Sequence, residues 1–354
     1  MKYYVCEHQF EGFHAKTAFS KARLDAERIC EADGFRPLSL RADETDYIHA
    51  NALKKLAGHW TRRNAWADML SGLTAGDTLF LQMPVLYNSM LLGGVLQRLR
   101  KNGVHIIALL HDLELIRLCM LEDFDRKRKF RMRAEEEALL AACDRIIVHN
   151  GRMAELLAAH GIDRQRMVLL EIFDYLADGA PAGGGDDSER GLIVAGNLTP
   201  EKAGYIYTAP EDVRLELYGV NFAGAERENL RYHGAFAPEE LPDRLRGGFG
   251  LVWDGPDADT CRGTYGEYLR YNNPHKTSLY LASGLPVAIW DEAAMAGFIT
   301  REQAGITAGS LREASEIARS MSPEEYRRLC ENACRIGREL RRGAYLRRAL
   351  TEKE

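Results

Sequence analysis

Short apolar runs alternate with amphipathic, helix-forming segments along the whole chain. In the first half, the apolar runs at 78–83, 104–110 and 144–150 predict strands. The segments between them, such as 89–101 and the alanine- and glutamate-rich 127–142, predict helices. This alternation is typical of α/β architecture with largely parallel sheets.

The composition changes near residue 180. Residues 177–187 are rich in glycine, alanine and aspartate, which cannot supply a core, and they predict a flexible linker. Beyond them the alternation restarts, with strand-like runs at 191–195, 213–218 and 250–253. We therefore predict two Rossmann-like domains that face a central cleft. The predicted division is an N-terminal Rossmann-like domain at 1–176, a linker at 177–190, a C-terminal Rossmann-like domain at 191–321 and a basic C-terminal helix at 322–354.

The tail from 323 to 350 predicts one long helix that carries eight arginines. Such a basic face could contact anionic lipid. Glutamates are interspersed among the arginines, which favours a solvated helix over a membrane-binding one. The helix could also cross back and pack on the first domain.

Composition narrows the class of protein. A chain of 354 residues favours two domains, and a net charge of −5 argues against a nucleic-acid binder. The seven cysteines show no CxxC or Cys/His cluster. The stretch closest to an acidic DxD cluster, Asp257-Ala258-Asp259, lies in a loop with Gly and Pro and is interpreted as a turn, so we expect no metal site. No N-terminal apolar run and no window of about 18 apolar residues occurs, which predicts a cytoplasmic protein.

The most informative stretch is 272–290, which predicts a loop, a short helix and a buried strand. Asn273 is suited to cap the helix and Pro274 to its first position. Gly284 can adopt the left-handed conformation after the last turn, and Pro286 prevents continuation.

The start of that helix has the chemistry of an anion site. Exposed N–H groups and the helix dipole favour an anion at the first turn. Lys276 would add a point charge, and Thr277 and Ser278 would add hydroxyl donors, which together suit a diphosphate. The alternative is a well-capped surface helix with a solvated lysine.

A second anion candidate follows the strand at 191–195. Gly196 would let a ligand approach the backbone closely, and Lys202 could reach a phosphate. A Gly-Asn turn followed by an exposed lysine is also common without function. If both loops are strand ends of one domain, Lys202 and Lys276 would converge on a diphosphate leaving group without a metal.

His111 and Asp112 end the clearest strand of the first half, where α/β enzymes present catalytic groups. Asp112 could act as a general base toward a hydroxyl, and His111 could contact a sugar or phosphate. The alternative is an ordinary helix start. The aromatic and glycine residues of 219–222 and 232–236, including Tyr232, could contact a base or ribose, or could be simple turns.

With these residues assembled, the chain resembles bacterial glycosyltransferases of the B-type fold. It is similar to the family of β-1,6-galactofuranosyltransferases and of glucosyltransferases that extend GlcNAc on serine-rich adhesins. The resembling segments are 81–84 (LQMP), 111–114 (HDLE), 147–150 (IVHN), 173–176 (FDYL), 195–198 (AGNL) and 271–276 (YNNPHK), the last of which is the most specific. The resemblance implies a UDP-sugar donor held mainly by the second domain, with no metal and no cofactor.

Carried over to this sequence, the resemblance assigns the nucleotide diphosphate to six consecutive residues and to the first-domain loop. These residues are Lys276, Thr277, Ser278, Leu279, Tyr280 and Leu281, with Thr17 or Lys16 approaching from the first domain. Lys202 stands at the lysine of a Gly-Arg-Leu-x3-Lys-Gly motif, in which Asn197 here replaces the arginine. The Glu-x7-Glu pattern of retaining relatives is not evident, because His275 follows Glu267 by eight, and inversion is the better hypothesis.

The resulting prediction is a metal-independent glycosyltransferase that moves a hexosyl or galactofuranosyl unit from UDP to a glycan, glycolipid or glycoprotein hydroxyl. A UDP-sugar epimerase or a non-catalytic sugar-nucleotide-binding subunit of a polysaccharide assembly complex are the alternatives. No nucleic-acid partner is expected, while peripheral membrane contact and a homo-oligomer remain open.

Overall fold

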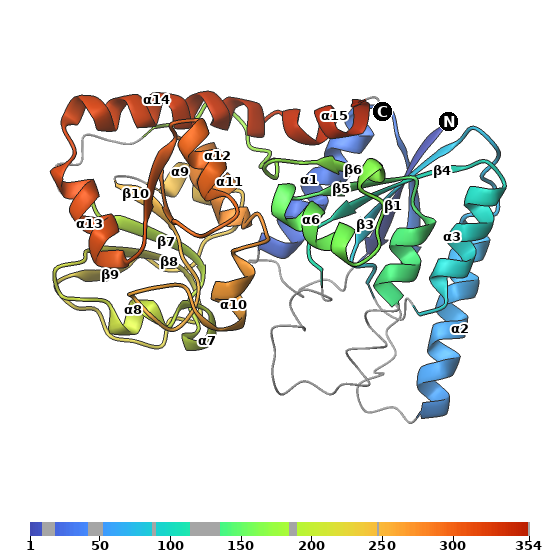
Figure 1. Ribbon diagram of the computed structural model, residues 1–354, viewed down its shortest axis with the longest axis horizontal. Helices are drawn as coiled ribbons and strands as arrows, with labels where there is room; N and C mark the ends of the chain where they lie inside the picture. The colour runs from blue at the N-terminus through green and yellow to red at the C-terminus, as the bar shows by residue number, and fades with distance from the viewer. Residues whose placement is uncertain are drawn as a thin grey trace. The chain divides into compact units, whose positions relative to one another are not determined.

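The computed structural model describes residues 1–8, 18–41, 52–86, 90–113, 135–183, 190–245 and 248–352. The chain divides into two compact units, each built on its own parallel sheet (Figure 1). Among the described residues, the first unit holds 1–8, those within 26–169, and 352, and the second holds 18–25 and those within 170–351. The predicted α/β fold with two Rossmann-like domains is confirmed.

The sheet of the first unit has six parallel strands in the order β2-β1-β3-β4-β5-β6. The strands are β1 (Lys2–His8), β2 (Arg36–Arg41), β3 (Thr78–Met83), β4 (His105–Leu110), β5 (Arg145–Val148) and β6 (Met167–Leu169). The helical segments are α1 (Ala18–Ala32), which continues across the boundary between the units, α2 (Ala52–Met69), α3 (Leu92–Lys101), α6 (Gly151–Ala159) and the 3₁₀ turn η1 (Arg164–Arg166). Strands β3 and β4 are buried after their first residue, as expected for a parallel sheet covered on both faces.

The sheet of the second unit also has six parallel strands, in the order β12-β11-β10-β7-β8-β9. The strands are β7 (Leu192–Asn197), β8 (Leu215–Val220), β9 (Leu230–Tyr232), β10 (Phe249–Val252), β11 (Val287–Trp290) and β12 (Gly305–Ala308). The helices are α7 (Pro200–Ala203), α8 (Tyr205–Thr208), α9 (Leu241–Arg244), α10 (Gly263–Tyr268), α11 (His275–Ala282), α12 (Ala296–Arg301), α13 (Leu311–Ser320), α14 (Pro323–Leu340) and α15 (Ala344–Thr351).

The strand order of the second sheet reverses between β7 and β10. The chain builds β8 and β9 on one side of β7, then returns to build β10 to β12 on the other. Ligands of open α/β sheets bind at the carboxyl ends of the strands beside such a reversal. The loops after β7 and β10 are therefore the part of this unit best placed for a ligand.

The C-terminal tail differs from the predicted single helix. It forms α14 and α15, because Gly343 between them takes a left-handed backbone conformation with φ +72°. Helix α14 is amphipathic and runs beside α11 and α12 in Figure 1. Its approach to α11 is so close that a Cβ atom on Gly337 would lie 2.3 Å from the Leu281 carbonyl oxygen. One face of the tail is therefore buried in the second unit rather than solvated.

The described part of the predicted linker also packs on the second unit. The backbone N–H of Gly183 donates to the Ser283 carbonyl over 3.2 Å, and the Asp178 carbonyl accepts from Arg341. No helix within the described ranges is long and apolar enough to cross a membrane.

Asp174 joins the segment at 170–176 to the start of α15. Its buried carboxylate accepts from the backbone N–H groups of Tyr345 (3.1 Å) and Leu346 (2.7 Å). Burial raises the pKa of Asp174 to about 7, although the two N–H groups act in the opposite direction.

This pKa predicts a pH dependence of stability. In the unfolded chain Asp174 loses its proton near the ordinary pKa of about 4, whereas in the folded chain it keeps the proton up to about pH 7. Between these pH values the folded state binds more protons, so the free energy of unfolding falls as pH rises. The thermal midpoint of the wild type relative to Asp174→Asn should therefore decrease over that range, as measured by scanning calorimetry. A difference that is constant with pH would contradict this account.

Candidate functional site

The loops after β7 and β10 are bound to each other. The backbone N–H of Gly255 donates to the Lys202 carbonyl over 2.8 Å, and that of Tyr205 donates to the Gly255 carbonyl over 3.2 Å. A Cβ atom on Gly204 would lie 2.8 Å from the Cα atom of Pro256, so only glycine fits there. Because of these contacts, residues 202–205 and 255–256 form one tightly packed surface at the strand reversal, which we call the ledge.

Lys276, in the first turn of α11, is fixed on this ledge. Its Nζ atom donates to the Trp253 carbonyl over 2.9 Å and to Oδ1 of Asp254 over 2.7 Å. The side chains of Lys276 and Asp254 are only 14% and 8% exposed. An ammonium group has three N–H donors, so two are used by these contacts and one remains for a ligand.

Lys202 lies on the same ledge with its charge less constrained. Its ammonium lies over the ring of Tyr265, 5.6 Å from the centroid. In the described part of the chain, no carboxylate forms an ion pair with it. Lys202 and Lys276 therefore both contact the loop that follows β10, Lys202 through its backbone and Lys276 through its side chain, and their joint contact with a diphosphate stays a prediction.

Helix α11 is locked against the sheet by Tyr280. The hydroxyl oxygen of Tyr280 accepts from the Ala195 N–H over 2.8 Å, and its ring lies 2.0 Å from where a Cβ atom on Gly250 would be. The side chains of Leu279 and Leu281 are also buried. These three side chains therefore belong to the core of the unit, and their contact with a nucleotide stays a prediction.

The first turn of α11 differs from the prediction. Pro274 is the N-cap residue and offers no side-chain cap, while the Asn273 amide donates instead to the Glu171 carbonyl over 2.9 Å. The Ser278 hydroxyl donates to the Phe173 carbonyl over 2.6 Å. The Thr277 hydroxyl is fully buried and has no hydrogen-bond partner among the described residues. A buried polar group without a partner is costly, so Thr277 marks a position where a ligand atom could bind.

The predicted residues near β7 and β9 serve mainly the local backbone. Gly196 has a φ of +131°, and its carbonyl oxygen lies 1.8 Å from where a Cβ on Gly219 would be. The Asn197 side-chain oxygen accepts from the Asn221 amide over 3.0 Å. The Tyr232 hydroxyl donates to the Gly219 carbonyl over 2.9 Å. These contacts fix the loop beside the ledge.

The segment 254–271 contains α10 and is ordered by Arg270. This guanidinium forms ion pairs with Glu267 and Glu292 and lies 4.5 Å from the Trp290 ring centroid. Cys261 in the same segment is buried, and burial raises the pKa of its thiol, which disfavours the reactive thiolate.

In the first unit, His111 and Asp112 follow β4 as predicted. His111 is 9% exposed, and its Nε2 atom lies 2.6 Å from Oε1 of Gln82, at the end of β3. Asp112 is half-buried. Lys16 and Thr17 lie outside the described residues.

Sequence reasoning missed Asp254 and Gln82. Asp254 contacts the predicted Lys276, and Gln82 contacts the predicted His111. Both lie at or just beyond the carboxyl end of a buried strand, β10 and β3 respectively. That position was the signal that could have identified them.

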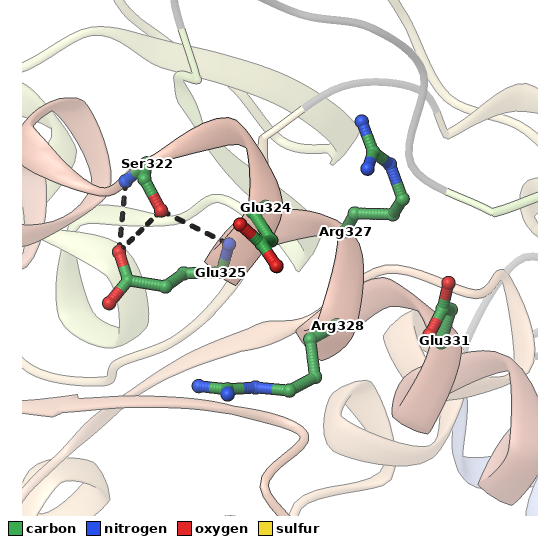
Figure 2. Close-up of a pocket in the computed structure, with 6 residues that line it drawn as sticks. All are labelled: Ser322, Glu324, Glu325, Arg327, Arg328 and Glu331. Atoms are coloured by element: carbon green, nitrogen blue, oxygen red, sulfur yellow. Dashed lines mark hydrogen bonds between the residues drawn. The ribbon is translucent and has the colours of Figure 1, made fainter.

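A separate cavity of about 650 Å³ lies beside the start of α14 (Figure 2). It is lined by Ser322, Glu324, Glu325, Arg327, Arg328 and Glu331. Ser322 and Glu325 form the capping box of the helix: the Ser322 hydroxyl accepts from the Glu325 N–H, and the Glu325 carboxylate accepts from the Ser322 N–H, as the dashed lines in Figure 2 show. The lining mixes both signs of charge and includes none of the predicted site residues. No group of three or more potential metal ligands occurs in the described ranges.

Comparison with known proteins identifies the family. The model of the glucosyltransferase 3-like N-terminal domain matches residues 2–172, and that of the C-terminal domain matches 192–353. The chain is 39% identical to β-1,6-galactofuranosyltransferase WbbI of Escherichia coli K12 over 70% of this chain and 74% of the relative. It is 23% identical to glucosyltransferase 3 of Streptococcus parasanguinis over 80% of each chain.

Solved structures show the same two-domain fold at low identity. Sucrose-phosphate synthase from Thermosynechococcus elongatus has a TM-score of 0.63 at 11% identity, with 99% of this chain and 96% of that chain covered. Anabaena HepE in complex with UDP has a TM-score of 0.57 at 10% identity, with 98% and 97% covered. The chain therefore belongs to the glucosyltransferase 3-like family of glycosyltransferases, with the GT-B fold.

Proposed function

We propose that this enzyme moves a hexosyl or galactofuranosyl unit from a UDP-sugar to a hydroxyl of a glycan, glycolipid or glycoprotein acceptor. The names of the relatives support a galactofuranosyl or glucosyl unit, and a UDP complex with the same fold supports the nucleotide. The resemblance of the sequence to this family points the same way.

One observation carries the proposal: the start of α11 combines three unsatisfied features that suit a diphosphate. The helix has no side-chain cap, the buried Thr277 hydroxyl has no partner among the described residues, and Lys276 keeps one N–H donor beyond its contacts with Trp253 and Asp254. Helix N-termini favour anions through their N–H groups and dipole. A diphosphate would satisfy all three features at once.

The same groups would stabilise the leaving group. As the glycosidic bond to UDP breaks, negative charge develops on the terminal phosphate, and Lys276 and Lys202 would neutralise it without a metal. The acceptor hydroxyl would lose its proton to His111 or Asp112, which follow β4 in the first unit. Inversion at the anomeric carbon follows from a single displacement of this kind.

The test is a panel of UDP-glucose, UDP-galactose, UDP-galactofuranose and UDP-GlcNAc, each with EDTA. A ligand that binds only the folded state raises the thermal midpoint, so the true donor should raise it and should release UDP slowly. No shift with any donor would overturn the proposal. Conversion of the UDP-sugar to an epimer without an acceptor would show an epimerase instead.

Replacement of Lys276 tests its role with the leaving group. Lys276→Met should lower turnover by about 100-fold or more, because the charge on the leaving phosphate loses its fixed cation. Since the substitution also leaves Asp254 buried without its partner, the double variant Asp254→Asn/Lys276→Met controls for misfolding. The exposed Lys101→Met is the matched control and should retain turnover. Wild-type turnover in Lys276→Met would contradict the assignment.

Replacement of Thr277 by valine separates ligand binding from packing. Valine has the same shape without the buried hydroxyl, so the thermal midpoint of the unligated protein should be unchanged or higher. The affinity for UDP should fall about 10-fold, because one hydrogen bond to a charged phosphate is lost. Titration calorimetry measures the UDP affinity and scanning calorimetry measures the thermal midpoint, with Thr307→Val on β12 as the control. Unchanged UDP affinity would show that this hydroxyl does not contact the nucleotide.

A further inference from the structure

A chain of hydrogen bonds runs through the first unit behind His111. Nε2 of the Gln82 amide donates to Oε1 of Glu27, on α1, over 3.3 Å. The amide oxygen of Gln82 lies 2.6 Å from Nε2 of His111. The other carboxylate oxygen of Glu27 accepts from the Cys6 thiol, on β1, over 3.2 Å. The four residues come from α1, β1, β3 and the end of β4, and all belong to the first unit.

The donors and acceptors of this chain have a fixed direction. A carboxylate can only accept hydrogen bonds, so Gln82 must present its NH₂ group to Glu27 and its carbonyl oxygen to His111. The Cys6 thiol remains a donor, since burial and the charge of Glu27 raise its pKa to about 12. The opposite orientation of Gln82 would place its oxygen against the carboxylate, acceptor against acceptor. His111 must therefore carry a proton on Nε2.

The backbone at His111 is held as firmly as the ring. The N–H of His111 donates to the Met83 carbonyl over 2.8 Å, which joins the ends of β3 and β4. Next to it, Nε2 of the fully buried His149 lies 3.0 Å from the Leu110 carbonyl, to which it donates. Burial lowers the pKa of His149 to about 4, so His149 is neutral and serves as a structural donor.

We propose that Gln82 and Glu27 are positioning residues that hold His111 in the Nε2–H tautomer, with Nδ1 as its basic nitrogen. This inference rests on the proposed transferase function and assigns the general base to His111 rather than to Asp112. In this assignment Glu27 acts on His111 through Gln82.

The acceptor oxygen forms its bond to the anomeric carbon while its proton moves to Nδ1 of His111, and the electron pair of the breaking carbon–oxygen bond leaves with UDP. The ring becomes an imidazolium whose Nε2–H still donates to Gln82. The carboxylate of Glu27 behind Gln82 stabilises this positive charge.

Nitrogen-15 NMR of histidine-labelled protein tests the tautomer directly, at about pH 8, where an ordinary histidine is neutral. The signals of His111 are identified by their loss in His111→Asn. The inference expects Nε2 to carry the proton and Nδ1 to carry none, with an Nε2–H proton protected from exchange with water. A His111 ring protonated on Nδ1 in the wild type would overturn it.

Variants then test the positioning. Gln82→Met should remove the protected N–H signal and lower kcat about 10- to 100-fold, with little change in the KM for the donor. Gln82→Glu alone should be impaired because two carboxylates face each other. In the double variant Glu27→Gln/Gln82→Glu, the amide at position 27 donates to the carboxylate at position 82, and that carboxylate accepts from Nε2–H of His111. Every donor again faces an acceptor, so this variant should recover the signal and most of the kcat.

The exposed Gln97→Met on α3 is the matched control and should change neither readout. An unchanged kcat in Gln82→Met, or no recovery in a folded double variant, would overturn the positioning role. If the wild type transfers no sugar from any donor, the proposed function fails, while the NMR experiment still decides the direction of the hydrogen-bond chain.

Discussion

The structure of the second unit depends on the close contact between α11 and the sheet beneath it. Tyr280 fills the space over Gly250 and bonds to the backbone of Ala195, so α11 is fixed to both strands at the reversal. On its other side, Gly337 lets α14 approach the backbone of Leu281. Lys276 precedes Tyr280 by four residues, just over one helical turn and about 6 Å along the axis. Packing in the core therefore determines where the cation and the N-terminus of α11 lie.

The two units present polar groups by the same physical means. In each, parallel strands end at one edge of the sheet, and a carboxylate outside the predicted set holds the residue of interest. Asp254 holds Lys276 in the second unit, and Glu27 holds His111 through Gln82 in the first. A carboxylate reduces the freedom of a flexible or titratable group, so little ordering remains to be done when a substrate binds.

Much of the fold follows from local sequence, because the apolar runs of buried parallel strands and the end of α11 at Gly284 are local signals. Two local predictions were wrong. Asn273 does not cap α11, since its amide bonds the backbone of Glu171, which is distant in sequence. The tail is divided into two helices at Gly343. The glycine itself was a sufficient local signal for this break, but the arginine-rich pattern on both sides of it suggested one continuous helix. The ion pair of Asp254 with Lys276 and the chain behind His111 depend on tertiary contacts and could not be predicted.

The most direct test of the nucleotide site is hydrogen exchange measured by mass spectrometry with and without UDP. The account predicts slower exchange in peptides that cover the ledge and the start of α11, at 197–204, 253–263 and 271–279. These segments contain the Lys202 and Gly255 backbone contacts and the uncapped first turn. UDP binding that leaves all three segments unchanged, with slower exchange only elsewhere in the chain, would contradict the account.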